Sequence, residues 1–319
     1  MLNKKILKIV LVFLCIFFAI VFGIIYFGGF VLPSAKTVFV RTIPFKRSSV
    51  GMYVINLDHS TARWNHIKKH LSGFPFPVHR ISGVYGKSYP GLRDTPGIVD
   101  LEKYRKCLKG KEPGLGEIGC YLSHRKAIIA FLRSKFEFAI IVEDDVSFKP
   151  FFLKVMRKLL ACKKKWDICT FELHPLQSGW PISAQNFSFG VNLSVYLKES
   201  WRAGAYLINR WAARRLLERS LPMCLPWDMY YMRFWEFKDF LGKRMKFMGI
   251  EPRCAFQTFG DSDIEQAGPR QISTHYAKEK YRWYGRFFDL CSHVSRFVHG
   301  LLIWCSVRWE RNDEKTSIS

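Results

Sequence analysis

Short apolar runs alternate with helical segments along most of the chain. Residues 51–57 and 138–142 are rich in aliphatic and β-branched side chains, which is typical of buried strands. A capping sequence at residues 58–61 precedes a predicted helix over 62–71, and apolar residues at steps of three and four predict another over 117–133. This alternation predicts an α/β domain with a mostly parallel central sheet. Further strands are predicted over 78–83, 166–171 and 205–208, further helices over 151–162 and 210–220, and a long surface loop over 86–115.

An uninterrupted apolar segment lies near the N-terminus. No charged residue occurs between Lys8 and Lys36, and residues 9–32 are almost entirely aliphatic or aromatic. About 20 such residues cross a bilayer, so we predict a single transmembrane helix between a basic tail (1–8) and a linker (33–49). A cleaved signal peptide, with an apolar core of about 7–15 residues, is the alternative. This run is longer and lacks a clear small-x-small cleavage site.

The end of the chain, residues 271–319, is predicted to be a basic, aromatic helical region that follows the α/β domain of residues 50–270. Its apolar side chains recur at steps of three and four, which defines one face of a helix. That face fits a helix packed on the domain core, or a helix that lies in a membrane interface. The face consists of Phe287, Cys291, Val294, Val298, Leu301 and Cys305, with Arg282, Arg286, Arg296, Trp283 and Trp304 along the same stretch.

The formal net charge is +24. Nucleic acid, an anionic membrane surface or a phosphorylated substrate would each be attracted by such a charge. No helix-turn-helix, zinc-finger or aromatic RNA-binding signature is present, so we expect no nucleic-acid partner. A membrane lipid surface is a predicted partner, because each Lys or Arg near anionic lipid contributes about 1 kcal/mol.

Nine cysteines are scattered along the chain without a C-x-x-C pair. This pattern argues against a disulfide framework or a structural zinc site, and it mildly favours a reducing compartment. Two N-glycosylation sequons, at Asn186 and Asn192, are matches that often arise by chance and do not decide the compartment.

The predicted strand over 138–142 runs directly into Glu143, Asp144 and Asp145. Three adjacent carboxylates repel one another, and a divalent cation relieves that repulsion. Magnesium and manganese prefer oxygen ligands, and α/β sheets bind ligands beyond the carboxyl ends of their strands. The alternative interpretation is a solvated acidic loop that caps a helix. The triplet alone does not name a reaction.

Two further residues are candidates for chemistry. Asp228 lies among aromatic residues, where a partly desolvated carboxylate can act as a general base, although it can equally cap a helix. His124 follows Ser123, and no Cys or Asp lies at metal-ligand spacing from it. A lone histidine of this kind is more often structural.

Six segments, in order, give the chain a family resemblance. Residues 51–265 resemble glycosyltransferase family 25, the lipooligosaccharide and lipopolysaccharide sugar transferases related to collagen galactosyltransferases. Each segment alone is a weak signal, but six in the right order are a strong one. The matching segments are residues 53–57 with Arg63, 116–124, 140–146, 203–208 with Ala212 and Ala213, 226–228, and 252–264.

The resemblance implies a GT-A type nucleotide-binding domain and an inverting transfer of a hexose, galactose or glucose, from a UDP-sugar to a saccharide or glycolipid acceptor. It implies a divalent metal, Mn²⁺ or alternatively Mg²⁺, held by Asp144 and Asp145. Asp228 is the candidate base, with Glu172 in reserve. The candidate donor-binding residues are Asn56, Leu57, Arg63, Glu117, Ser123, His124, Glu143, Asp144, Gly204 and Tyr206.

Other functions and two locations remain open. A metal-dependent phosphohydrolase would use the same triplet but needs further metal ligands, and an inactive, membrane-tethered carbohydrate-binding relative is also possible. A bacterial chain would be held in the inner membrane with its catalytic domain in the cytoplasm, and the cysteine pattern favours this location. A eukaryotic chain would be a type II protein of the secretory pathway. The resemblance covers neither the apolar span nor the C-terminal region.

Overall fold

The computed structural model describes residues 49–172, 179–198, 201–238, 242–258 and 275–316. The predicted basic tail, the membrane span and nearly all of the linker lie outside these residues. The acidic stretch at residues 261–264, which contributes to the family resemblance, lies outside them as well.

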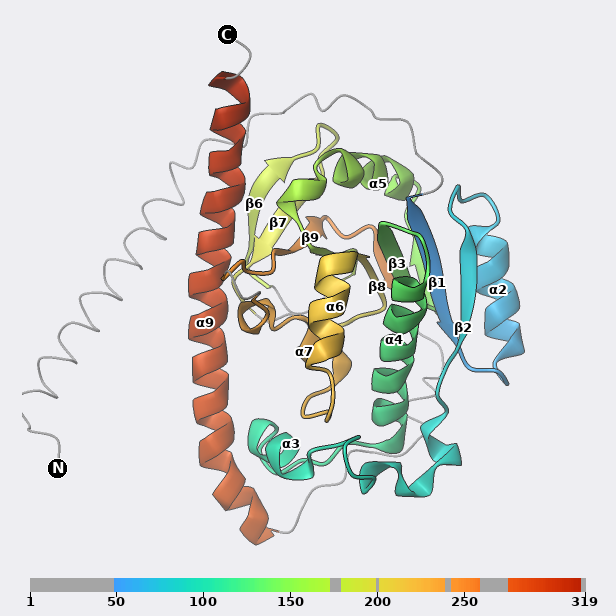
Figure 1. Ribbon diagram of the computed structural model, residues 1–319, viewed down its shortest axis with the longest axis vertical. Coiled ribbons are helices and arrows are strands. Elements are labelled where there is room, and N and C mark those ends of the chain that lie inside the picture. Colours follow the sequence, from blue (N-terminus) through green and yellow to red (C-terminus); the bar gives the residue numbers. More distant parts are fainter. Residues whose placement is uncertain (1–48, 173–178, 199–200, 239–241, 259–274, 317–319) are drawn as a thin grey trace, which may run out of the picture. The chain divides into compact units, whose positions relative to one another are not determined.

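Among the described residues, one mixed sheet is formed by the strands β1 (Val50–Asn56), β2 (Val78–Ser82), β3 (Phe138–Glu143), β5 (Ile168–Thr170), β6 (Pro181–Asn186), β7 (Asn192–Tyr196), β8 (Ala205–Asn209) and β9 (Phe247–Glu251). The strand order is β2-β1-β3-β8-β5-β9-β7-β6 (Figure 1). All strands except β7 and β8 run in the same direction. The predicted α/β class and mostly parallel sheet are therefore confirmed. A short antiparallel ribbon pairs β4 (Val146–Phe148) with β10 (Ala255–Gln257).

Helices cover this sheet. The longest of the central ones, α4, packs on β1, β2, β3 and α6, and its buried face carries Ile118, Tyr121, Ile128 and Phe131. These residues recur at steps of three and seven, as expected of a helix with one side in the core. The helices are α2 (Thr61–Leu71), α3 (Leu101–Cys107), α4 (Leu115–Arg133), α5 (Phe152–Ala161), α6 (Arg210–Glu218) and α7 (Trp227–Tyr231), with short 3₁₀ turns η1 (Gly86–Ser88), η2 (Pro90–Arg93), η3 (Lys163–Lys165) and η4 (Phe234–Glu236).

Residues 86–115 are more ordered than the predicted surface loop. They contain η1, η2 and α3, so the prediction of a long loop is wrong here. Asp100 caps α3 by accepting a hydrogen bond from the Lys103 backbone N at 2.9 Å. Tyr104 is fully buried and donates a hydrogen bond to Glu117 of α4. In the sequence, the surrounding charged and glycine residues give no sign that Tyr104 is buried.

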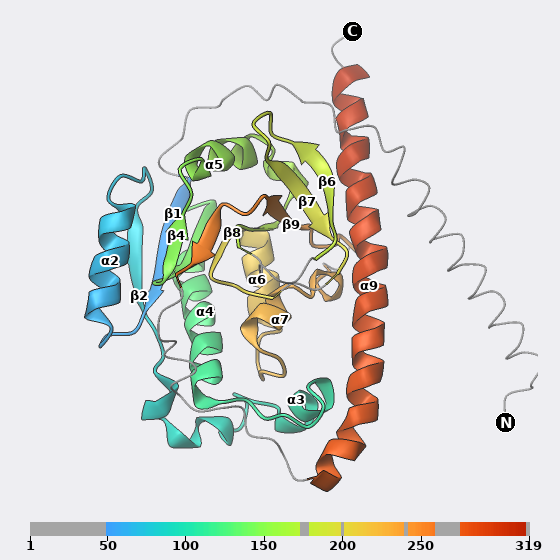
Figure 2. The same ribbon diagram turned by 180° about the vertical axis from the view of Figure 1, so that it is seen from behind.

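The helix α9 (His275–Thr316) runs beside β6 and β7 and packs against α3 (Figures 1 and 2). Gly285 permits the contact with α3, because a Cβ atom there would lie 2.4 Å from Cγ of Lys109. Arg296 is buried, donates a hydrogen bond to the Met232 carbonyl at 2.9 Å and lies over the Trp235 ring. The face of α9 that packs on the domain thus includes a glycine, Gly285, and a buried arginine, Arg296.

The predicted apolar face of α9 points away from the domain. Phe287, Val294 and Val298 are exposed, as are Cys291 and Cys305. The helix does pack on the domain, as one of the two interpretations has it, but mainly through the opposite face; of the predicted face, Leu301 is partly buried against the core. By length and composition, the segment Tyr281–Arg308 meets the criteria for a membrane-crossing helix, which many core helices of soluble proteins also meet.

The turn η1 approaches α4 so closely that it requires glycine. A Cβ atom at Gly86 would lie 1.8 Å from the Leu115 carbonyl oxygen, and one at Gly119 would lie 2.4 Å from the Val84 carbonyl oxygen. Both contacts are with backbone atoms, which cannot move aside as a side chain can. These two glycines therefore fix the loop of residues 84–87 against α4.

We predict that Gly86→Ala lowers the free energy of unfolding by about 3 kcal/mol, because the added methyl group forces η1 and α4 apart. Gly91→Ala is the matched control, since a Cβ atom at that position meets nothing within 4 Å. Urea denaturation of both variants measures the difference. Equal midpoints would contradict the close approach of η1 and α4.

Candidate active site

A cavity of about 120 Å³ lies at the carboxyl ends of β1 and β3. These strands are parallel neighbours in which Ile55 pairs with Glu143, so the residues after them emerge at the same edge of the sheet. The N-terminal half of α4 and the loop of residues 84–87 supply the other walls. The predicted site residues that line the cavity are Asn56, Leu57, Arg63, Ser123, His124, Glu143, Asp144 and Asp145.

Asp144 is buried and held by two side chains. Its Oδ2 accepts a hydrogen bond from Asn56 Nδ2 at 2.6 Å, and its Oδ1 forms an ion pair with Arg63 of α2. Asn56 is itself fixed, because its Oδ1 accepts hydrogen bonds from Arg80 Nε at 2.9 Å and Arg80 Nη2 at 2.6 Å. Hydrogen bonds that involve charged groups are stronger than neutral ones. This network therefore sets the direction of the Asp144 carboxylate.

Asp145 has the most exposed side chain of the triplet. Its Oδ2 lies 3.5 Å from Arg63 Nη2, and its Oδ1 lies 3.4 Å from Gln257 Nε2. Burial, and then the negative charge of Glu143, raises the pKa of Asp145 to about 7 against the opposing effect of Arg63. Negative charge is thus in excess at this point of the cavity, which is the condition that a divalent cation relieves.

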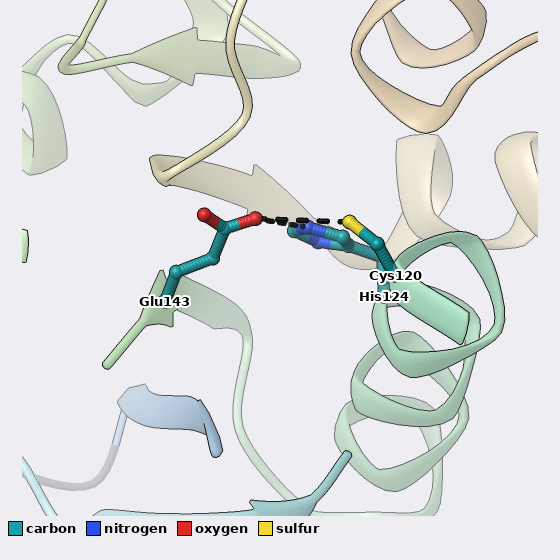
Figure 3. A group of neighbouring side chains, drawn as sticks. All are labelled: Cys120, His124 and Glu143. Atoms are coloured by element: carbon teal, nitrogen blue, oxygen red, sulfur yellow. Dashed lines mark hydrogen bonds and ion pairs between the residues drawn. The ribbon is translucent and has the colours of Figure 1, made fainter. Parts of the chain in front are cut away.

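Glu143 points toward Cys120 and His124 of α4 (Figure 3). Its Oε1 lies 3.1 Å from His124 Nε2 and 3.9 Å from Cys120 Sγ, while its Oε2 accepts a hydrogen bond from Gln257 Nε2 at 2.6 Å. Burial acts to raise the pKa of Glu143, but the hydrogen bond and charge of His124 outweigh it and hold that pKa below its ordinary value. Glu143 therefore stays ionised and fixed in direction.

His124 is fully buried and connects the cavity to the domain core. Its Nδ1 lies 3.2 Å from the Tyr206 hydroxyl, and its ring stacks on Trp227 with centroids 5.3 Å apart and planes inclined by 6°. Both ring nitrogens are thus engaged by protein groups. The geometry suits a residue that orients Glu143.

Two groups of side chains are candidates for holding a metal ion. The ligand atoms of Cys120, His124 and Glu143 lie within 4.8 Å of one another (Figure 3). Burial, together with the charge of Glu143, raises the pKa of the Cys120 thiol well above its ordinary value, which favours a protonated thiol in a hydrogen-bonded network. Asp144 and Asp145 instead offer the oxygen atoms that manganese and magnesium prefer. The aspartates fit such a cation better.

Three predicted donor-binding residues lie behind the cavity wall. Glu117 accepts the hydrogen bond from Tyr104 and is turned toward α3. Gly204 accepts a backbone hydrogen bond from Glu143 N at 2.8 Å, and Tyr206 supports His124 from the core side. These placements argue against direct donor contact by any of the three.

Glu172, the reserve base, is fully buried and does not line this cavity. Its Oε1 accepts hydrogen bonds from Arg202 Nη1 at 2.8 Å and from the Gln257 backbone N at 2.7 Å. Burial raises its pKa. Gly204 leaves room for this carboxylate, since a Cβ atom there would lie 2.4 Å from Glu172 Oε2. In this arrangement, Glu172 holds Gln257 in position.

Asp228 lies at the start of α7 and lines a second cavity, of about 350 Å³. Its Oδ1 accepts a hydrogen bond from the adjacent Met229 backbone N at 2.9 Å, but Pro226 is the N-cap of α7, so the alternative interpretation of Asp228 as a helix cap is wrong. Two observations connect Asp228 to the first cavity. Asp228 directly follows Trp227, whose ring stacks on His124. The pKa of the Cys120 thiol in the first cavity is raised mainly by burial, and the negative charges of Glu143 and Asp228 raise it further.

Several residues of the first cavity were not predicted. Lys87 lies in the segment interpreted as a surface loop, and Tyr85 directly precedes that segment, outside any predicted element. Gln257 lies in β10, which reaches the triplet by pairing with Val146 of β4. No local pattern signals that long-range pairing. Cys120 belongs to a matched segment without an assigned role, and the expectation that no Cys lies at metal-ligand spacing from His124 is wrong, because Cys120 precedes it by one turn of α4.

Comparison with known proteins identifies the family. The sequence profile of "Glycosyltransferase family 25 (LPS biosynthesis protein)" matches residues 50–231. The chain therefore belongs to glycosyltransferase family 25. The helix α9 lies beyond the matched residues.

Two animal relatives illustrate the similarity. A "Glycosyltransferase 25 family member" of Anopheles gambiae is 28% identical over 216 residues, and "Procollagen galactosyltransferase 1-B" of Xenopus laevis is 30% identical over 210 residues. Each match covers 64% of this chain, but only 35% and 34% of the relatives. The chain thus aligns with about a third of the length of these curated relatives.

We predict that His124→Ala lowers the free energy of unfolding by about 2–4 kcal/mol, because it removes a packed ring and the partner of two buried polar groups. His66→Ala, at an exposed position of α2, should change it by less than about 0.5 kcal/mol. Thermal denaturation followed by circular dichroism compares the two. A small effect of His124→Ala would mean that the network is not structural.

Proposed function

We propose that the chain transfers a hexose, galactose or glucose, from a UDP-sugar to a saccharide hydroxyl with inversion at the anomeric carbon, in a domain of GT-A type. The observation that carries this proposal is the carboxylate triplet at the sheet edge, in a cavity that also presents the cations of Arg63 and Lys87. A nucleoside diphosphate needs such positive charge. The name of the Xenopus relative specifies galactose, so UDP-galactose is the first donor to test.

The donor is proposed to occupy the first cavity. Asp144 and Asp145 would hold Mn²⁺, or Mg²⁺ in its place, which when bound would offset the charge of the leaving diphosphate. Lys87 and Arg63 add fixed positive charge on the loop and α2 sides. The loop is tied to α4, because the Val84 backbone N donates a hydrogen bond to Ser123 Oγ at 2.8 Å. Ser123 therefore acts on the donor through the position of this loop.

Inversion requires one base on the acceptor side. The acceptor hydroxyl oxygen bonds to the anomeric carbon, the bond to the UDP oxygen breaks, and the hydroxyl proton passes to the base. We assign that role to Asp228, because it is partly exposed, lines the second cavity and directly follows Trp227, whose ring stacks on His124 of the donor cavity. Glu143 is oriented by His124 and Gln257 instead, and Glu172 is sealed from both cavities.

A membrane lipid surface is the proposed partner of the exposed face of α9. This face presents Trp283, Phe287 and Leu290 beside the exposed arginines Arg282 and Arg286. Aromatic and aliphatic side chains next to basic ones suit the boundary between acyl chains and anionic headgroups. Together with the predicted span over residues 9–32, this face would hold the catalytic domain near a glycolipid acceptor.

We predict that Asp145→Asn weakens Mn²⁺ binding about tenfold or more and abolishes manganese-dependent release of UDP from UDP-galactose, because one of the proposed oxygen ligands loses its charge. Electron paramagnetic resonance of free Mn²⁺ measures the binding without turnover. Cys120→Ser is the control and should retain both properties. If Cys120→Ser lost Mn²⁺ binding while Asp145→Asn retained it, the metal would be held by the group of Cys120, His124 and Glu143, which would contradict the proposal.

We predict that Asp228→Asn lowers kcat for sugar transfer about 100-fold or more, because the acceptor hydroxyl loses its base. KM for the UDP-sugar should remain unchanged, since Asp228 does not line the donor cavity. Asp94→Asn, an exposed site, serves as the matched control. Steady-state release of UDP with a panel of saccharide acceptors gives both constants. Full activity of Asp228→Asn would remove it from the mechanism.

We predict that, in protein lacking residues 1–36, the combined change of Trp283, Phe287 and Leu290 to Ala reduces sedimentation with liposomes of anionic phospholipid about tenfold or more, because three exposed apolar side chains no longer enter the interface. Trp180→Ala, an exposed tryptophan outside α9, should bind as the parent does. Equal binding of the triple variant and the parent would exclude a lipid role for this face.

A further inference from the structure

The second cavity is enclosed by parts of the chain that lie far apart in the sequence. Its walls come from the turn after α3, from α7, from the segment at Trp201 and from α9, in a volume of about 350 Å³. Small-molecule sites commonly have volumes of about 300–1,000 Å³. The cavity is therefore large enough for a ligand. The side chains that give it chemical character are Lys109, Lys111, Trp201, Asp228, Asp289 and His293.

The side chains that line this cavity suit a sugar ring. A pyranose has an apolar face of C–H groups and a rim of hydroxyl groups. Trp201 is 41% exposed and offers a flat aromatic surface for the apolar face. Asp228 and Asp289 can accept hydrogen bonds from hydroxyl groups, and Lys111 and His293 can donate them. Opposite charges are both present, which suits a neutral, hydroxyl-rich ligand better than an ion.

The α9 wall of the cavity is held in a defined position. Lys109 Nζ forms an ion pair with Asp289 Oδ2 at 2.6 Å, next to the close approach at Gly285. One turn further along the helix, Ser292 Oγ accepts a hydrogen bond from Arg233 Nη1 at 2.9 Å. Asp289 and His293 therefore project from a helix that is fixed on both sides of them.

We propose that this cavity binds the acceptor saccharide, with Trp201 as the stacking surface and α9 as the wall that selects the acceptor. The assignment of the ligand as an acceptor rests on the proposed glycosyl transfer. Its position supports that assignment, since Asp228 opens into this cavity and is adjacent to Trp227, whose stacking partner His124 lines the donor cavity. A hydroxyl bound beside Asp228 would lie next to the proposed base.

One consequence concerns specificity. The family profile ends at residue 231, whereas Asp289 and His293 lie in α9. The segment that completes the cavity is thus outside the region shared with the family. The acceptor preference of this chain is therefore expected to depend on its C-terminal helix, while donor use depends on the matched domain.

The test is saturation-transfer NMR of the full-length protein in detergent with galactose, glucose and N-acetylglucosamine, each in the presence of UDP and Mn²⁺. At least one sugar should show transfer from the protein. Trp201→Ala should weaken its binding about tenfold, equivalent to about 1.4 kcal/mol, and His293→Ala should weaken it measurably. Trp180→Ala, which removes an exposed tryptophan outside the cavity, should leave binding unchanged.

Turnover gives a separate readout. Trp201→Ala should raise KM for the acceptor sugar about tenfold without changing UDP release from UDP-galactose in the absence of acceptor. If a sugar binds in a manner that depends on Trp201 but no turnover is found, the saccharide site is supported and the proposed transferase reaction is contradicted. Absence of binding by all three sugars, or equal binding by wild type and Trp201→Ala, would overturn the inference.

Discussion

Three consecutive carboxylates at the end of a fully buried strand are the constraint around which this domain is arranged. Successive residues at the end of a strand point in different directions, so the fold separates the three charges instead of leaving them together. Asp144 turns toward β1 and α2, Glu143 toward α4, and Asp145 remains the most open to the cavity. Each direction gives its carboxylate a different set of partners and hence a different role.

Those partners come from almost every layer of the fold. Asn56 is delivered by β1, Arg63 by α2, His124 by α4 and Gln257 by β10. The buried groups behind them, such as Tyr206 and Glu172, line neither of the two cavities but hold these partners in place. The excess negative charge that remains near Asp145 makes a divalent cation a chemically reasonable ligand of this site, and the cations of Arg63 and Lys87 are what would attract a diphosphate.

The strands and the triplet could be predicted because they depend on local patterns. An apolar run of five residues followed by three acids identifies the end of β3 without reference to the rest of the chain. Gln257 could not be found in this way, because it reaches the site through the pairing of β10 with β4. Periodicity likewise identified one apolar face of α9 but could not tell that the opposite face packs, using Gly285 and Arg296.

The most direct test of this account is the position of the metal. Crystals grown with UDP and MnCl₂ should give an anomalous manganese peak beside Asp145, at the carboxyl ends of β1 and β3. Density for UDP should extend from that peak toward Lys87 and the loop of residues 84–87. A manganese peak among Cys120, His124 and Glu143 instead, or UDP bound outside this cavity, would contradict the central claim.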